Sequence, residues 1–137
     1  MFEKFSKQNK KYDERITITK SFNFGFPARF FSENNLSSFK YVVLYFDNES
    51  KEIGFQFTSD EQEKYKYTLF GQGKTKEGYG GSIIASSFFR NYNIDPKIYH
   101  GKYTPEKRLV EGIGDLFVIK LSNKTADITG SSEVLKP

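Results

Sequence analysis

The 137-residue sequence contains no cysteine, no tryptophan and a single histidine. Without cysteine the chain can form neither a disulfide nor a thiolate metal site, and this composition suits a reducing compartment. Its longest uninterrupted apolar run is Tyr41–Phe46, far shorter than a membrane-spanning helix needs. The charged N-terminal residues lack the apolar stretch of a signal peptide. We therefore expect a soluble, cytoplasmic protein that does not enter a membrane.

Aromatic residues are abundant, since 15 Phe and 9 Tyr bring the aromatic share to 18%. A chain with this much apolar surface can offset the entropy lost on folding, so we do not expect disorder. Aromatic side chains favour strands, which predicts a β-rich domain. The formal net charge is +4 and the isoelectric point about 9.1, a mild preference for polyanionic partners.

One short unit occurs twice in a blurred form. Ser21–Leu36 runs from alternating phenylalanines through a proline to an Asn-Asn pair, and Gly80–Ile94 repeats this order in outline. The Phe pair at 30–31 matches the pair at 88–89, an offset of 58, and at that offset Asn35 falls on Asn93. We therefore predict two related halves. The alternative is that small α+β domains reuse such strand–helix units independently.

Periodicity predicts the elements of both halves. In the first half we expect a strand at Arg15–Lys20, Phe22, Phe24 and Phe26 on one face, a helix at Ala28–Asn34, and a hairpin that pairs Tyr41–Phe46 with Ile53, Phe55 and Phe57. The second half should begin with strands at Tyr65–Leu69 and 82–85, separated by a glycine-rich loop at 71–81. A helix at Ser86–Tyr92 should follow, and then a strand at Tyr99–Tyr103 in the place of Tyr41–Phe46. A turn at Glu106-Lys107 would lead to the last strand, Leu116–Leu121.

These elements predict a mostly β, α+β fold. Two related strand–short helix–hairpin halves, residues 15–57 and 65–121, would form one compact barrel- or sheet-like domain. Residues 1–14 would be a flexible basic arm and residues 122–137 a polar C-terminal tail. Gly54, inside a strand, indicates a bulge or a close backbone approach.

No set of residues forms a convincing catalytic motif. Gly73-Lys74-Thr75 resembles the end of a phosphate-binding loop, but Thr68 stands where its first glycine should be and no helix pattern follows. His100 is the lone histidine, and the acidic cluster at residues 60–63 belongs to a polar loop. We therefore expect no enzyme, no catalytic residues, no cofactor and no metal site.

Basic residues recur beside each copy of the repeated unit. Such residues on one sheet edge would form a stripe that contacts phosphates, although they could equally be ordinary surface charges offset by Glu33, Glu77 and Asp95. Lysine also alternates with tyrosine at residues 64–67, and exposed tyrosines are platforms on which single strands stack. The tyrosines in question are Tyr65, Tyr67, Tyr79 and Tyr92, and packing in the protein core would explain them equally well.

The segment ITITKSFNFGFPARFFSENNL, followed by KYVVLYFDNESKEIGFQF, resembles the swapped-hairpin DNA-binding domains of the AbrB/MraZ type. Lys20, Phe24, Phe26, Pro27 and Leu36 match that pattern in type, and the second copy would make a tandem pair as in the MraZ branch. The resemblance implies an intertwined domain that binds duplex DNA, with a role in transcription regulation. It implies contacts through Arg15, Lys20 and Arg29.

Two other classes fit the pattern. One is a single-strand binder similar to PC4 and Whirly proteins, whose sheets carry basic and aromatic residues. The other is a small protein-interaction module or inhibitor, of the kind phages carry, that acts through an exposed sheet edge.

We expect a non-catalytic nucleic-acid-binding protein that takes DNA rather than RNA, and a homodimer. The nucleic-acid-binding residues predicted from the sequence are Arg15, Lys20, Arg29, Lys66, Lys74, Lys76 and Arg90.

Overall fold

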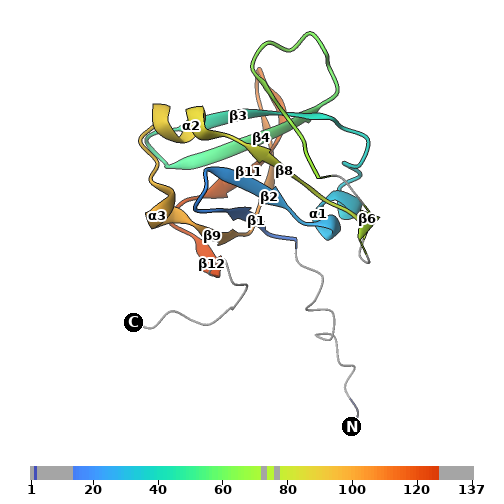
Figure 1. Ribbon diagram of the computed structural model, residues 1–137, viewed down its shortest axis with the longest axis horizontal. Helices are drawn as coiled ribbons and strands as arrows, with labels where there is room; N and C mark the ends of the chain where they lie inside the picture. Colours follow the sequence, from blue (N-terminus) through green and yellow to red (C-terminus); the bar gives the residue numbers. More distant parts are fainter. Residues whose placement is uncertain (1, 3–13, 72–73, 76–77, 127–137) are drawn as a thin grey trace.

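A computed structural model describes residues 2, 14–71, 74–75 and 78–126. Two five-stranded antiparallel sheets pack face to face, and short helices lie beside them (Figure 1). The fold is mostly β, as predicted, and the two sheets stay open. Of the two predicted arrangements the barrel is therefore wrong, because the sheets do not close on each other.

Sheet A has the order β12 (Lys124–Ala126), β9 (Gly101–Tyr103), β1 (Ile16–Ile18), β2 (Asn23–Phe26) and β8 (Gly81–Ile84). Sheet B has the order β10 (Glu106–Val110), β11 (Gly114–Lys120), β4 (Glu52–Thr58), β3 (Tyr41–Asp47) and β5 (Lys66–Thr68). A separate two-stranded ribbon consists of β6 (Lys74–Thr75) and β7 (Gly78–Tyr79). The helices are α1 (Ala28–Glu33), α2 (Ser86–Asn91) and α3 (Pro96–Tyr99).

The core between the sheets is aromatic. Strand alternation turns Phe24 and Phe26 inward from sheet A, and both rings meet Phe55 of sheet B edge to face, with centroids 4.9 and 5.6 Å apart. Each of α1 and α2 adds its phenylalanine pair to the same core. The two short helices are therefore held by their buried rings, since neither has a side-chain cap at its N-terminus.

Elements that we matched between the two predicted halves lie side by side. Strand β2 pairs with β8, and β4 pairs with β11, both antiparallel. After each helix an asparagine has a positive φ, 56° at Asn35 and 55° at Asn93, and the next residue, Leu36 or Ile94, is buried. The predicted helix ends are thus confirmed, because asparagine tolerates the left-handed conformation there.

The second half departs from the sequence-based prediction in its hairpin. Of the strand predicted at Tyr99–Tyr103, Gly101–Tyr103 form β9 whereas Tyr99 ends α3, and β9 pairs with β1 in sheet A, so it does not take the place of β3. The hairpin partner of β11 is β10, where we expected a turn at Glu106-Lys107. The prediction was wrong because β10 is a charged edge strand, with Leu109 78% exposed, and lacks the apolar pattern of a buried strand.

Further differences concern segments expected to lack structure. Lys124–Ala126 form β12 within the predicted polar tail, and β6 and β7 lie within the predicted loop at 71–81. Gly54 marks neither the predicted bulge nor a close backbone approach, since the strand register runs through it unshifted and a Cβ there would lie 2.8 Å from a side-chain atom, Leu116 Cδ1. The predicted basic arm, apart from residues 2 and 14, lies outside the described residues.

In the described part of the chain, no helix has the length and apolar character to cross a membrane.

Candidate nucleic-acid interface

A row of small and polar side chains crosses the outer face of sheet A. Ile16 and Ile18 are buried, so Thr17 between them points outward. Thr17 pairs with Lys102 on one side and with Gly25 on the other, and Gly25 in turn pairs with Ser82. An isolated bridge pairs Ser82 with Phe70, which is 50% exposed. Paired residues of antiparallel strands share a face. The row therefore runs from a cation through hydroxyls to an aromatic ring.

Gly25 occupies the centre of this row without a packing reason. Its φ is not positive, and a Cβ built on it would meet only Thr17 Cβ at 3.7 Å, an ordinary contact. A glycine inside a strand weakens the strand, and such glycines often mark places where a ligand or another backbone approaches closely. The fold tolerates a side chain at position 25, so the bare surface there calls for a functional reason.

The two sheets differ in charge. The strands of sheet A carry Lys102 and Lys124 and no aspartate or glutamate, whereas those of sheet B carry four carboxylates and four cations. Arg15 and Lys20 flank β1 and add to the positive side, while Glu14 lies next to Arg15 and is 3.6 Å from Arg29 Nε. Sheet A is therefore the face on which a polyanion would meet the least repulsion.

The turn between β1 and β2 forms a cationic rim of this face. Lys20 lies exposed in the turn. Phe22 precedes β2 and has φ 69°, a strained conformation for an aromatic residue, and its ring packs against the same core as Phe24, the side on which we expected it. Its ring lies beneath Arg90 of α2, with Cζ 5.1 Å from the ring centroid. Among the described residues, no carboxylate lies within ion-pair distance of Lys20 or Arg90.

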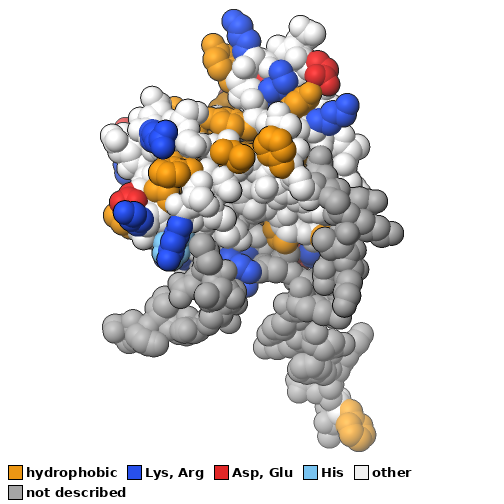
Figure 2. Space-filling view, in the orientation of Figure 1, with side chains coloured by type: hydrophobic (Ala, Val, Ile, Leu, Met, Phe, Trp, Pro, Cys, Tyr) orange, Lys and Arg blue, Asp and Glu red, His pale blue; other side chains and the backbone are white. Residues whose placement is uncertain are grey.

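The remaining residues predicted from the sequence are not gathered into one stripe. Arg15 donates a hydrogen bond to Thr125 Oγ1 and so ties β12 to the start of β1. Arg29 is paired with Glu33 at 2.9 Å on α1. On the face drawn in Figure 2, lysines and arginines lie in several separate places.

Three predicted residues come from the segment between residues 66 and 76. Lys66 lies in β5 of sheet B and donates to the backbone carbonyls of Glu61 and Glu63. Lys74 belongs to the ribbon strand β6, and Lys76 lies outside the described residues. The structure thus places Arg15 and Lys20 at the two ends of β1 and Arg90 on α2 against Phe22, and it places Arg29 and Lys66 in contacts elsewhere.

The sequence-based analysis missed Thr17, Gly25, Ser82, Phe70 and Lys102. The alternation in ITITK did predict that Thr17 faces away from the core, and Gly25 stands between two phenylalanines that point inward. That these residues lie in one row depends on the register between strands far apart in the chain, which no local pattern reveals.

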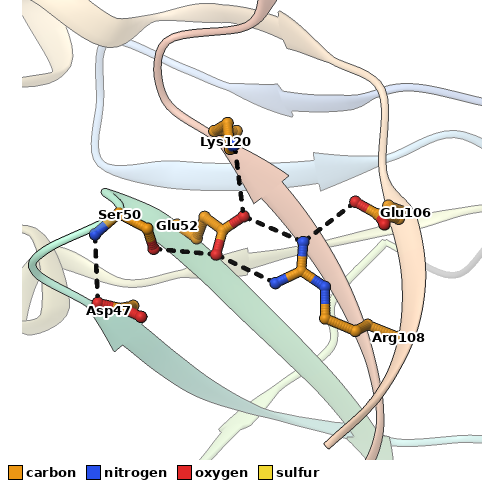
Figure 3. Close-up of polar contacts among 6 residues, drawn as sticks. All are labelled: Asp47, Ser50, Glu52, Glu106, Arg108 and Lys120. Carbon is orange, nitrogen blue, oxygen red and sulfur yellow. Dashed lines mark hydrogen bonds and ion pairs between the residues drawn. The ribbon is translucent and has the colours of Figure 1, made fainter.

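A second polar cluster lies on sheet B and has a structural explanation. The Arg108 guanidinium binds both carboxylate oxygens of Glu52 at 3.0 Å and also Glu106 at 3.1 Å (Figure 3). These hydrogen bonds from Arg108 are the main cause that holds the pKa of Glu52 below its ordinary value, helped by Ser50 and Lys120. The network cross-links β4, β10 and β11, and its charges are already satisfied within the protein.

Among the described residues, no group of three or more histidine, aspartate or glutamate side chains could hold a metal ion. The resemblance to AbrB/MraZ domains and the second resemblance to PC4 and Whirly proteins stay predictions. No family model matches this chain, and neither the curated proteins nor the solved structures contain a match.

Proposed function

We propose that this protein is a non-catalytic nucleic-acid-binding protein whose outer face of sheet A takes the sugar–phosphate backbone. The observation that carries the proposal is the row Lys102–Thr17–Gly25–Ser82, a bare and hydroxyl-lined strip on a sheet whose strands have no carboxylate. Hydroxyls and lysines are ordinary phosphate partners, and a glycine lets a backbone approach the sheet closely.

Lys20 and Arg90 would supply charge at the rim. Neither side chain has a carboxylate partner among the described residues, so no ion pair has to break when it binds a phosphate. Each phosphate neutralised by such a cation releases condensed counterions, which makes the affinity fall as salt rises. The partner that we favour is DNA and the compartment is the cytoplasm, both as expected from the sequence.

The test is fluorescence anisotropy with a labelled oligonucleotide across a salt series. We expect binding with a steep salt slope, and we expect Lys20→Gln to weaken binding and to lower that slope by about one. Lys51→Gln is the matched control, because Lys51 also lies exposed in a hairpin turn, the one between β3 and β4 of sheet B. No binding at low salt, or equal effects of the two variants, would overturn the proposal.

A second candidate function rests on the free edge of sheet B. Among the described strands β10 pairs with β11 alone, and its Leu109 is one of the most exposed apolar side chains. Such an edge can accept a strand from a protein partner or from a second copy, which would also give the expected homodimer. Analytical ultracentrifugation of the wild type and of Leu109→Lys tests this edge, and an unchanged monomer–dimer balance would exclude dimerisation through it.

We also propose that the two halves are related copies. The pairing of β4 with β11 supports this, because Gly54 lies opposite Val118 while Ile53 and Phe55 face Ile119 and Phe117. Every antiparallel pair has a local two-fold axis, but this one passes between Gly54 and Val118, which are counterparts at the offset of 64 that matches Phe117 to Ile53.

A further inference from the structure

A groove lies between β5 and the outer side of α2, away from the row on sheet A. Its volume is 690 Å³, and aromatic rings line it: Tyr65, Tyr67, Phe88 and Tyr92. Ligand sites of small molecules have volumes of roughly 300–1,000 Å³, so the groove can hold a nucleoside-sized group. In Figure 2 hydrophobic side chains gather in the region of α2 and β8.

Two of the four rings of the groove are exposed to solvent, whereas Phe88 is buried and Tyr67 partly buried. Tyr65 is 74% exposed and Tyr92 is 43% exposed. Tyr92 is nevertheless fixed, because its ring lies 4.7 Å from that of Phe46 and 5.2 Å from that of Phe88. An aromatic ring that is held from behind and open in front is a platform for another flat ring.

Polar groups lie beside these rings. Ser87 and Asn91 are four residues apart on α2, so they lie on one side of the helix and both line the groove. Ser87 Oγ is 3.1 Å from the hydroxyl of Tyr67. An amide and hydroxyls can bind the edge of a base, and the residues that line the groove include Lys66 but no carboxylate. The carboxylate of the neighbouring Glu63 accepts a hydrogen bond from the Tyr65 backbone N–H.

We propose that the groove binds unpaired nucleobases, so that the nucleic acid this protein takes is single-stranded. This inference rests on the proposed function of sheet A and adds the class of strand to it. A base inside a duplex has both its faces stacked on neighbours, so it cannot lie against Tyr65 or Tyr92.

The groove and the row on sheet A involve neighbouring strands, although they share no lining residue. Phe70, at the end of that row, belongs to the same segment as Tyr65 and Tyr67, and β5 lies next to β8. A strand whose phosphates lie over Gly25 and Ser82 could therefore pass Phe70 and place its next bases in the groove. A partner protein is the competing occupant, and the experiment below separates the two.

The test compares a labelled single strand of about 12 nucleotides with its duplex, because sites of this type span about 4–16 nucleotides. The variants are Tyr65→Ala and Tyr92→Ala, with Tyr65→Phe and Tyr92→Phe as controls that keep the ring. Tyr65 is largely exposed, so its replacement leaves the core intact. A strand containing 5-iodouracil adds a direct readout, since light-induced cross-links form on the residues against which the base lies.

We expect the alanine variants to lose about tenfold in affinity for the single strand, the phenylalanine variants to keep it, and cross-links on Tyr65 or Tyr92. Unchanged affinity in the alanine variants, with a persistent salt slope and no such cross-link, overturns the groove and leaves the proposed function intact. No binding of either oligonucleotide at low salt overturns both, and the groove would then be a surface for a protein partner.

Discussion

Arg90 lies over the ring of Phe22, with its Cζ 5.1 Å from the ring centroid, and this contact joins α2 to the turn between β1 and β2. The same ring meets Phe89 of the core edge to face, at 6.0 Å. Phe22 holds this place in spite of a positive φ of 69°, a conformation that costs about 1 kcal/mol or more for a residue with a side chain. The ring of Phe22, held against Phe89, thus supports a guanidinium that has no carboxylate partner in the described structure.

Arg90→Gln tests whether this guanidinium contacts phosphate. We expect weaker nucleic-acid binding and a salt slope lower by about one, with little change in stability, because Arg90 is an exposed residue. Anisotropy titrations at several salt concentrations measure both quantities.

Arg29→Gln is the matched control for Arg90. Its guanidinium is paired with Glu33 at 2.9 Å, so we expect little effect on binding. A larger loss for Arg29 than for Arg90 would contradict the structural assignment and favour the contacts implied by the AbrB/MraZ resemblance.

Glu52→Gln tests the cross-link of sheet B through its pH dependence. The pKa of Glu52 is lowered from its ordinary value of 4.5, chiefly by Arg108. The carboxylate therefore stabilises the fold above pH 4.5, and this stabilisation is lost as the pH falls through the lowered value. We expect the variant to lose about 1 kcal/mol of unfolding free energy at neutral pH, a modest figure because solvent screens the partly exposed Arg108.

Urea unfolding at neutral pH and at about pH 3 measures this difference. The gap between wild type and Glu52→Gln should shrink at the acidic pH, because protonation of Glu52 removes the charge that Arg108 binds. An equal gap at both values would show that Glu52 acts through packing and not through its charge.

Gly54→Ala and Gly25→Ala form a matched pair for stability. At Gly54 the new methyl would lie 2.8 Å from the buried Leu116 side chain, so we expect a loss of about 1–3 kcal/mol. At Gly25 the same methyl has room, so we expect no loss and a gain of up to about 1 kcal/mol. Thermal unfolding of both variants decides the matter, and destabilisation by Gly25→Ala would show that the outer face of sheet A is packed by some other part of the protein.

Asn35 and Asn93 allow a test of the relation between the halves. Their φ values of 56° and 55° disfavour alanine, so we expect Asn35→Ala and Asn93→Ala each to cost about 1 kcal/mol. Glycine at either position should be nearly neutral, because it adopts this conformation without strain. Urea unfolding checks all four variants, and a cost at only one of the two positions would argue against equivalent roles.

Local patterns in the sequence predicted a large part of this fold. The alternation of Ile16 and Ile18 predicted β1, and the phenylalanine pairs with their asparagine stops predicted α1 and α2. The pattern failed at β10, where charged residues form an edge strand with only one partner strand. Edge strands need little buried surface, so their sequences carry a weak signal.

The candidate site was less accessible to prediction than the fold. Lys20 and Arg90 were among the predicted residues because basic residues are visible in a sequence, but only the structure shows that Arg29 is paired and that these two are not paired with a described carboxylate. Gly25 drew no attention, because only the structure shows that a side chain would fit there and that Thr17 and Ser82 lie on either side. The Tyr65 and Tyr92 groove likewise depends on α2 packing beside β5, a contact between segments distant in the chain.

Gly25→Val tests most directly whether the bare strip of sheet A is a binding surface. A branched side chain suits an outward strand position, so we expect stability equal to or above that of the wild type. The same side chain would hold a nucleic-acid backbone away from Thr17 and Ser82, so we expect at least about tenfold weaker binding, or a loss of about 1.4 kcal/mol. Wild-type affinity in a stable Gly25→Val protein would contradict the account.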